Sequence, residues 1–146
     1  MWINDNKRRI INVAVDLSIF GLERRDTPSV NAEFHVNQRT ANSQIEAATA
    51  SSTNGMSVAV WNSRYSSTDT DIRAQLYSPN GKKLGGEFAI TSDSRPEIEP
   101  TVGMDSNGNF VVAWAELRSG DYDIMAQRVS KTGKLLGSVI HVTSET

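Results

Sequence analysis

The chain repeats itself, and this repetition limits its possible folds more than any other feature of the sequence. Blocks of the first half return in the second half after about 50 residues. The repeated pairs are residues 44–61 with 97–114, 71–86 with 123–138, and 33–36 with 87–90. Differences in length between the copies fall in polar stretches, as insertions do when they lie in loops. We therefore expect two similar structural units.

Within each copy, apolar and polar residues alternate with the period of a β-strand. In residues 71–77 the apolar side chains are Ile72, Ala74 and Leu76, and residues 123–127 repeat this alternation. Asn54-Gly55 and Asn107-Gly108 each precede an apolar run and predict tight type I′ hairpins, because Asn-Gly adopts the positive φ angles that such a turn needs. The predicted strands are 45–50, 57–61, 71–77 and 87–90 in the first copy, and 98–104, 109–114, 123–129 and 139–142 in the second.

Four short strands in about 50 residues are typical of one blade of a β-propeller. We therefore predict an all-β, β-propeller-like fold with two four-stranded blade repeats, 33–86 and 87–138, and an extra terminal strand at 139–143. Residues 1–32 precede the repeats as an irregular segment of their own. In that segment a strand is expected near residues 10–17, with a helix as the alternative.

One pattern runs through both copies and is most complete in the second. It consists of Glu-Phe at 87–88, Pro-x-Val at 100–102, Gly-x-Phe-Val-Val-x-Trp at 108–114, Asp-Ile-x-Ala-Gln-Arg at 123–128, and Gly-x-x-x-Gly at 133–137. This pattern resembles the tandem repeats of large bacterial surface and secreted proteins. The resemblance covers residues 33–146 and implies propeller-like blades, often beside calcium-binding modules, in a secreted or cell-surface protein. It implies no catalytic residue.

Composition excludes several classes of function. The 146 residues suffice for one domain with a sizeable core. A net charge of −2 provides no basic surface for nucleic acid, and the absence of cysteine excludes disulfides, thiolate metal sites and thiol nucleophiles. The longest apolar stretch, residues 10–22, is interrupted by polar residues and is too short to span a membrane. It also lacks the cleavage site of a signal peptide.

Two repeated pairs of residues are candidates for ligand binding. Trp61 and Trp114 end equivalent strands, where they could offer aromatic platforms to a sugar or pack between sheets. Gln75 and Gln127 lie on the polar side of the third strand, where they could grip a hydroxyl-rich ligand or satisfy backbone groups of a loop. For both pairs the structural role is the commoner one, and we expect it here.

Acidic residues recur in the loop before the third strand. Asp69 and Asp71 in the first copy, and Asp121 and Asp123 in the second, stand two residues apart and are candidate calcium ligands. A calcium site needs six to eight oxygens, and the EF-hand pattern is absent. No other cofactor is expected.

Glutamates and histidines also recur between the copies. Glu46 and Glu99 occupy equivalent positions and, with Glu97, could supply the carboxylate pair of a glycosidase, although a solvated strand face is the commoner role. His35 and His141 share a repeat position at which the middle copy has Ala89, which argues against a shared metal site.

Two classes of function remain. The first is a non-catalytic binding or structural module that presents repeated β-blades to a glycan or protein partner, and the alternative is a propeller-type glycoside hydrolase that uses loop carboxylates. Repetition favours the first, because a catalytic constellation is asymmetric. A closed propeller takes typically about four to eight blades, and this chain supplies two. We therefore expect a homo-oligomer whose interface uses the chain ends, with a trimer ahead of a dimer.

Overall fold

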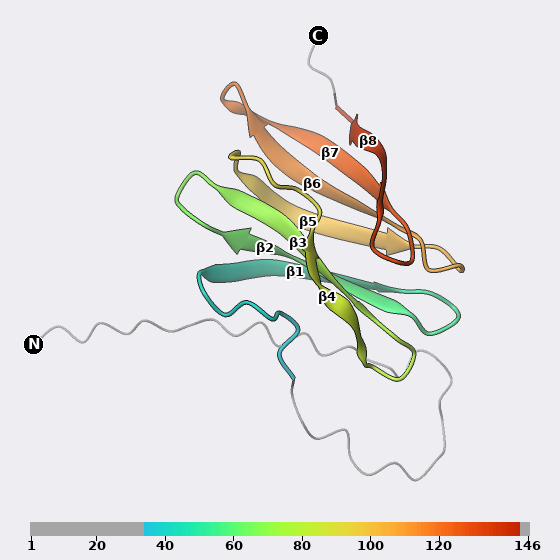
Figure 1. The fold of residues 1–146 in the computed structure, drawn as a ribbon. Helices are drawn as coiled ribbons and strands as arrows, with labels where there is room; N and C mark the ends of the chain where they lie inside the picture. The colour runs from blue at the N-terminus through green and yellow to red at the C-terminus, as the bar shows by residue number, and fades with distance from the viewer. Residues whose placement is uncertain (1–33, 144–146) are drawn as a thin grey trace, which may run out of the picture.

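The computed structural model describes residues 34–143 (Figure 1). This part of the chain contains eight strands and no helix, which confirms the all-β prediction. The strands form two antiparallel four-stranded sheets, each paired in the order of the sequence. The first sheet contains β1 (Ser43–Ser51), β2 (Ser57–Arg64), β3 (Thr70–Tyr77) and β4 (Lys83–Ala89). The second contains β5 (Glu97–Met104), β6 (Phe110–Arg118), β7 (Asp121–Val129) and β8 (Leu135–His141).

The segment 1–32 and the strand or helix expected near residues 10–17 lie outside the described residues. Between residues 34 and 143 there is no helix that is long and apolar enough to cross a membrane.

The two Asn-Gly pairs lie in hairpin turns, but the type I′ prediction is wrong. Among these residues only Gly55 and Gly108 have positive φ, at 85° and 88°, whereas a type I′ turn needs two such residues. The Gly55 amide donates to the Ser52 carbonyl oxygen at 3.0 Å, and the Ser52 amide donates to the Met56 carbonyl oxygen at 2.9 Å. The turn is therefore a longer one that ends on a left-handed glycine.

The fourth strand of each sheet begins earlier than the sequence predicts. β4 starts at Lys83 and β8 at Leu135, and each contains a glycine with positive φ, Gly85 or Gly137, at an interruption of the strand register. The glycines suggested a turn, but here they form bulges inside strands. Consequently residues 139–141 are not a separate terminal strand but the end of β8, where Ile140 pairs with Ala126. The first sheet ends at Ala89 and the second begins at Glu97, so the predicted strand at 87–90 belongs to the first sheet.

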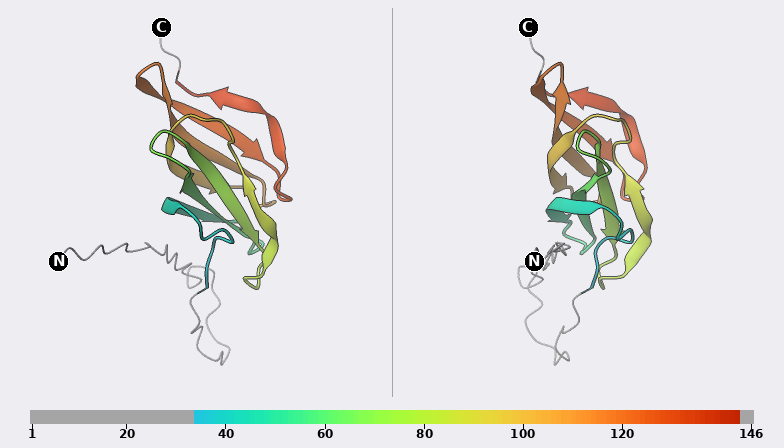
Figure 2. Two further views of the ribbon diagram at one scale, coloured as in Figure 1. Left: turned by 60° about the vertical axis from the view of Figure 1, so that its left-hand side comes forward. Right: turned by 90° about the vertical axis from the view of Figure 1, so that its left-hand side faces the viewer.

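The two sheets pack face to face, and β5 lies along the first sheet beside β1 (Figures 1 and 2). The core between them is apolar, and each large side chain buried there contributes about 1.5–3 kcal/mol. From the first sheet it contains Val58, Val60, Ile72, Ala74 and Leu76, with Ile90 just after β4; from the second it contains Phe110, Val112, Trp114, Met125 and Val129. Trp114 therefore faces the first sheet.

The opposite face of the first sheet carries a second, smaller core. Ala59, Trp61 and Tyr77 are buried there together with Val36, from the segment that precedes β1. The Tyr77 hydroxyl donates to the Val36 carbonyl oxygen at 3.1 Å. Each sheet thus has one face that carries a buried tryptophan and one aliphatic face, and the tryptophan face of the second sheet covers the aliphatic face of the first.

Candidate functional site

A polar network lies where the linker between β4 and β5 meets the second sheet. The Glu97 amide donates to the Thr70 hydroxyl at 2.7 Å, and that hydroxyl donates to the Glu97 carbonyl oxygen at 2.8 Å. On the linker, the Thr91 hydroxyl accepts a hydrogen bond from the Ile72 amide at 2.8 Å and donates to Oε2 of Glu97. Because Thr70 and Ile72 belong to β3 and Glu97 to β5, this network joins the two sheets.

The side chain at the centre of the network is a buried carboxylate. Glu97 is 0% exposed, and within residues 34–143 its Oε1 atom has no hydrogen-bond partner. Burial raises the pKa of Glu97 from 4.5 to about 8, because removing the group from water disfavours its charged form. The hydrogen bond from Thr91 opposes this shift, and the nearby charges of Asp93, Asp71 and Glu116 reinforce it.

Glu116 lies directly across from Glu97 in the pairing of β5 with β6, and it is also buried. Its Oε1 atom accepts hydrogen bonds from Nη1 of Arg95 and from Nε of Arg118, both at 2.7 Å. Two partly exposed arginines therefore balance one buried carboxylate. Removing either arginine would leave the negative charge of Glu116 less compensated.

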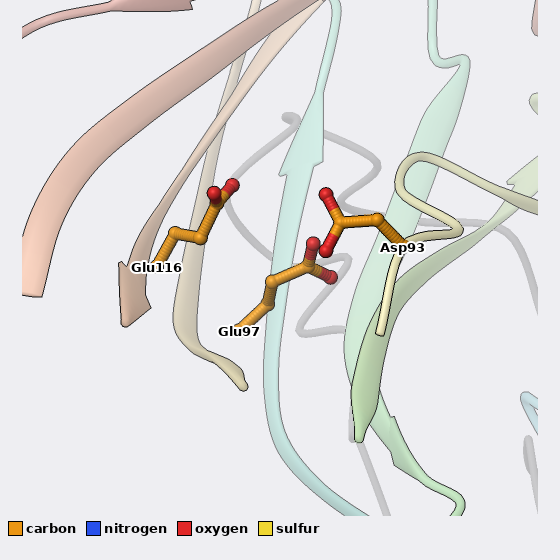
Figure 3. Close-up of side chains that lie close together, drawn as sticks. All are labelled: Asp93, Glu97 and Glu116. Atoms are coloured by element: carbon orange, nitrogen blue, oxygen red, sulfur yellow. The ribbon is translucent and has the colours of Figure 1, made fainter. Parts of the chain in front are cut away.

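Asp93 brings a third carboxylate from the linker. One oxygen each from Asp93, Glu97 and Glu116 lies within 4.8 Å of the others, and the three carboxylates gather in one place (Figure 3). Asp93 is exposed and accepts hydrogen bonds from the Arg95 amide at 2.9 Å and from its guanidinium at 3.0 Å. The three residues, called the junction carboxylates below, are hard oxygen donors of the kind that calcium prefers.

The tryptophans and glutamines singled out in the sequence have structural surroundings. Trp61 and Trp114 are 2% and 1% exposed, so the packing role expected for both is confirmed and neither indole presents a face to solvent. The Gln75 amide nitrogen lies 3.0 Å from the Leu76 carbonyl oxygen and within 3.5 Å of two carbonyl oxygens of β4. Gln127 repeats this arrangement against β8. Both glutamines thus satisfy backbone groups at the strand bulges.

The four aspartates predicted as calcium ligands are divided between the two sheets. Asp71, on β3, lies near the junction carboxylates, and its pKa is raised to about 6, first by burial and then by the charges of Asp69 and Asp93. Asp69 is exposed in the turn before β3. Asp121 and Asp123, on β7, belong to the second sheet, where Asp123 lines an open polar pocket with Arg118 and His141.

Sequence reasoning missed two of the junction carboxylates. Glu97 was considered with Glu46 and Glu99, but Asp93 and Glu116 were not singled out. One signal for Glu116 is present in the sequence. Residue pairs of the β5–β6 hairpin can be counted outward from the Asn107-Gly108 turn to find which residue lies opposite Glu97. That count fails by one residue, because β5 has an irregular register between Ile98 and Thr101.

No family model, curated protein or solved structure matches the chain. The resemblance of its repeats to those of bacterial surface proteins therefore stays a prediction.

Proposed function

We propose that the chain is a non-catalytic structural or binding module that assembles by stacking the outer face of its second sheet on a second copy of the same chain. The proposal depends on one observation, which is a difference in exposure between corresponding faces of the two sheets.

The aliphatic face of the second sheet, called the outer face below, is open to solvent. Val111, Ile124 and Ile140 lie on this face of β6, β7 and β8 and are 43%, 39% and 43% exposed. At the corresponding positions of the first sheet, Val58 and Ile72 are 1% and 0% exposed, because the second sheet covers them. The outer face is therefore the counterpart of a surface that is already buried once within this chain, except that Arg128 stands where the first sheet has the buried Leu76.

An open apolar face of this kind favours association. Leu136 and Val142 extend the outer face, and both are more than one third exposed. Soluble proteins seldom expose contiguous apolar patches of several large side chains unless a partner covers them. Covering a large aliphatic side chain contributes about 1.5–3 kcal/mol, so a handful of such residues can drive assembly.

The complementary surface is present at the other end of the same chain. Within the chain, the aliphatic face of the first sheet is covered by the face that carries Trp114, and the corresponding face of the first sheet carries Trp61. A second copy can therefore offer its Trp61 face to the outer face. This contact is head-to-tail, so repeating it gives a closed ring where the rotation between copies closes, and three copies with two sheets each then supply the six blades of a closed propeller.

Docking requires one local rearrangement. Val36 packs beside Trp61, and in the repeat it occupies the position of Ile90 and Val142. Head-to-tail stacking brings Val142 of one copy to the place that Val36 holds in the next. The mostly exposed segment from 34 to 42 therefore has to move aside as the copies join.

Light scattering across a concentration series tests the proposal. We expect the wild type to form oligomers and Ile140→Glu, which places a charge on the outer face, to be monomeric. Leu135→Glu is the matched control, because Leu135 is 41% exposed on the same strand but pairs with Val129, on the opposite face. A wild type that stays monomeric at all concentrations, or an equal effect of both variants, would overturn the proposal.

The glycoside hydrolase alternative has less support. Glu97 and Glu116 are 0% and 2% exposed, so a sugar cannot reach these two carboxylates. Glu46 accepts hydrogen bonds from the Asn62 side chain and from the Glu99 amide, which gives it a structural role. Because both indoles are buried as well, a protein partner fits the described residues better than a glycan.

A further inference from the structure

We propose that the junction carboxylates, Asp93, Glu97 and Glu116, form a calcium site between the two sheets. One oxygen of each lies within 4.8 Å of the others. Calcium binds oxygen at about 2.3–2.6 Å, so two ligands on opposite sides of one ion are about 4.6–5.2 Å apart. The spacing therefore allows all three groups to contact a single ion. This proposal does not depend on assembly.

The state of Glu97 is a second observation that points to a ligand. Its Oε1 atom is buried without a hydrogen-bond partner among the described residues, and the carboxylate lies in the cluster beside Asp93 (Figure 3). Burying a carboxyl oxygen without a partner is costly, and proteins usually pair such groups or bind metal ions with them. A cation at this point would satisfy Oε1.

The first sheet contains a corresponding junction that is built without these charges. Gln44 takes the place of Glu97. Its side-chain oxygen accepts a hydrogen bond from the side-chain amide of Asn37, much as the Glu97 carboxylate accepts one from the Thr91 hydroxyl. Opposite Gln44 in the strand pairing is Ser63, where the second sheet has Glu116. An amide and a hydroxyl thus suffice to build the junction. The charges of Asp93, Glu97 and Glu116 are therefore a feature of the second junction that the repeat does not require at the corresponding positions of the first.

One neighbouring arginine already occupies part of the cluster, because Nη1 of Arg95 donates to Oδ2 of Asp93 at 3.0 Å and to Oε1 of Glu116 at 2.7 Å, so a calcium ion has to displace it. The hydrogen bonds from Arg95 and Arg118 both reach Oε1 of Glu116, which leaves its Oε2 for a metal. The Arg95 side chain is 45% exposed and can turn toward solvent when a cation arrives. Three carboxylates supply at most six oxygens, so water would fill the remaining positions of a calcium ion, which takes six to eight.

A bound ion would brace the junction. Asp93 lies on the linker, Glu97 on β5 and Glu116 on β6, so one ion would fasten the linker to two strands of the second sheet. An ion that binds only the folded state raises the free energy of unfolding in proportion to the logarithm of its concentration above Kd. We therefore expect calcium to raise the melting temperature.

The experiment uses the full chain, freed of divalent ions by a chelator and then titrated with calcium chloride. Isothermal calorimetry should give the heat of a single site, and the melting temperature should rise as the site fills. Glu97→Gln is the decisive variant, because the chain itself accepts glutamine at the corresponding position 44. We expect it to fold and to bind calcium at least tenfold more weakly. Glu99→Gln is the matched control and should bind as the wild type does, since Glu99 is exposed and outside the cluster.

Two further variants make the result decisive. If Glu97→Gln does not fold, Asp93→Asn replaces it, because Asp93 is exposed and the same tenfold loss is expected. Asp71→Asn tests whether the ion binds at the aspartates before β3. The proposal is overturned if the wild type shows neither heat nor a change in melting temperature, or if Glu97→Gln and Asp93→Asn bind as the wild type does. It is also overturned if only Asp71→Asn abolishes binding. Light scattering of the same samples reports separately on assembly.

Discussion

Glu97 is buried in surroundings that disfavour the charged form of its side chain. In buffer free of divalent ions, its pKa of about 8 in the folded protein exceeds the ordinary value of 4.5. The folded state therefore holds this proton more tightly than the unfolded state, and its stabilising effect is lost as the pH rises between these two values. Asp71, raised from 3.8 to about 6, acts in the same direction. We predict that the contribution of this site to the free energy of unfolding decreases as the pH rises from about 5 to about 8. The melting temperature should therefore fall over this range.

The matched variant for this prediction is Glu97→Gln, which keeps an acceptor for Thr91 but does not titrate. Melting curves of both proteins in a chelating buffer should show a shallower pH dependence for the variant. A wild type that becomes more stable than the variant as the pH rises through this range would contradict the prediction.

Trp114 is the largest side chain of the core between the sheets, and it tests the packing interpretation at one position. The indole is 1% exposed, and its Nε1 has no hydrogen-bond partner in the described part of the chain. Trp114→Ala should lower the free energy of unfolding by about 3–5 kcal/mol, and Trp114→Phe by less, because phenylalanine loses no hydrogen bond and leaves a smaller cavity. Chemical denaturation measures both. An unchanged stability in Trp114→Ala would instead indicate a binding role.

At the scale of elements, the turns that lead into β4 and β8 provide an internal comparison. Gly81 and Gly133 occupy corresponding positions with φ of 76° and 83°. A Cβ on Gly81 would meet nothing within 4 Å, whereas one on Gly133 would lie 3.1 Å from the ring of Phe88 in β4. The turn before β8 therefore touches the first sheet, and the turn before β4 does not have such a contact.

We predict that Gly81→Ala lowers the free energy of unfolding by about 1–2 kcal/mol, which is the cost of a left-handed residue with a Cβ. Gly133→Ala should cost more, because the ring of Phe88 has to move as well. Chemical denaturation of the two variants side by side gives the comparison. Equal losses would mean that the contact between the turn and Phe88 adds nothing to stability.

At the scale of the whole molecule, the outer face makes stability depend on concentration. If copies stack as proposed, association stabilises the folded state, and the melting temperature rises with protein concentration. Ile140→Glu should remove this dependence, and Leu135→Glu should keep it, since only Ile140 lies on the outer face. Calorimetric scans over a wide concentration range provide the measurement. A melting temperature of the wild type that does not change with concentration would contradict the prediction.

The sequence by itself determined the class of the fold, because its signals are local. Alternation in residues 71–77 places Ile72, Ala74 and Leu76 on one face whatever the rest of the chain does, and these residues are buried together. The glycines of the two Asn-Gly pairs marked where the chain turns back. These patterns were sufficient to predict two four-stranded sheets and to predict that Trp61 and Trp114 would be buried.

Only the tertiary structure decided which carboxylates meet. Glu99 has a φ of 55°, a conformation that non-glycine residues seldom adopt. Its amide donates a hydrogen bond at 2.8 Å to the carboxylate of Glu46, which belongs to the other sheet. At this bulge two residues of β5 face one of β6, so Glu97 is brought opposite Glu116. A regular strand would place Glu97 on the opposite face, because a shift of one residue reverses every side chain. The same bulge recurs in β1, where Glu46 also has a φ of 55°, so the repeat itself carries it. Alternation of apolar and polar residues does not reveal this change of register, because alternation assumes a regular strand.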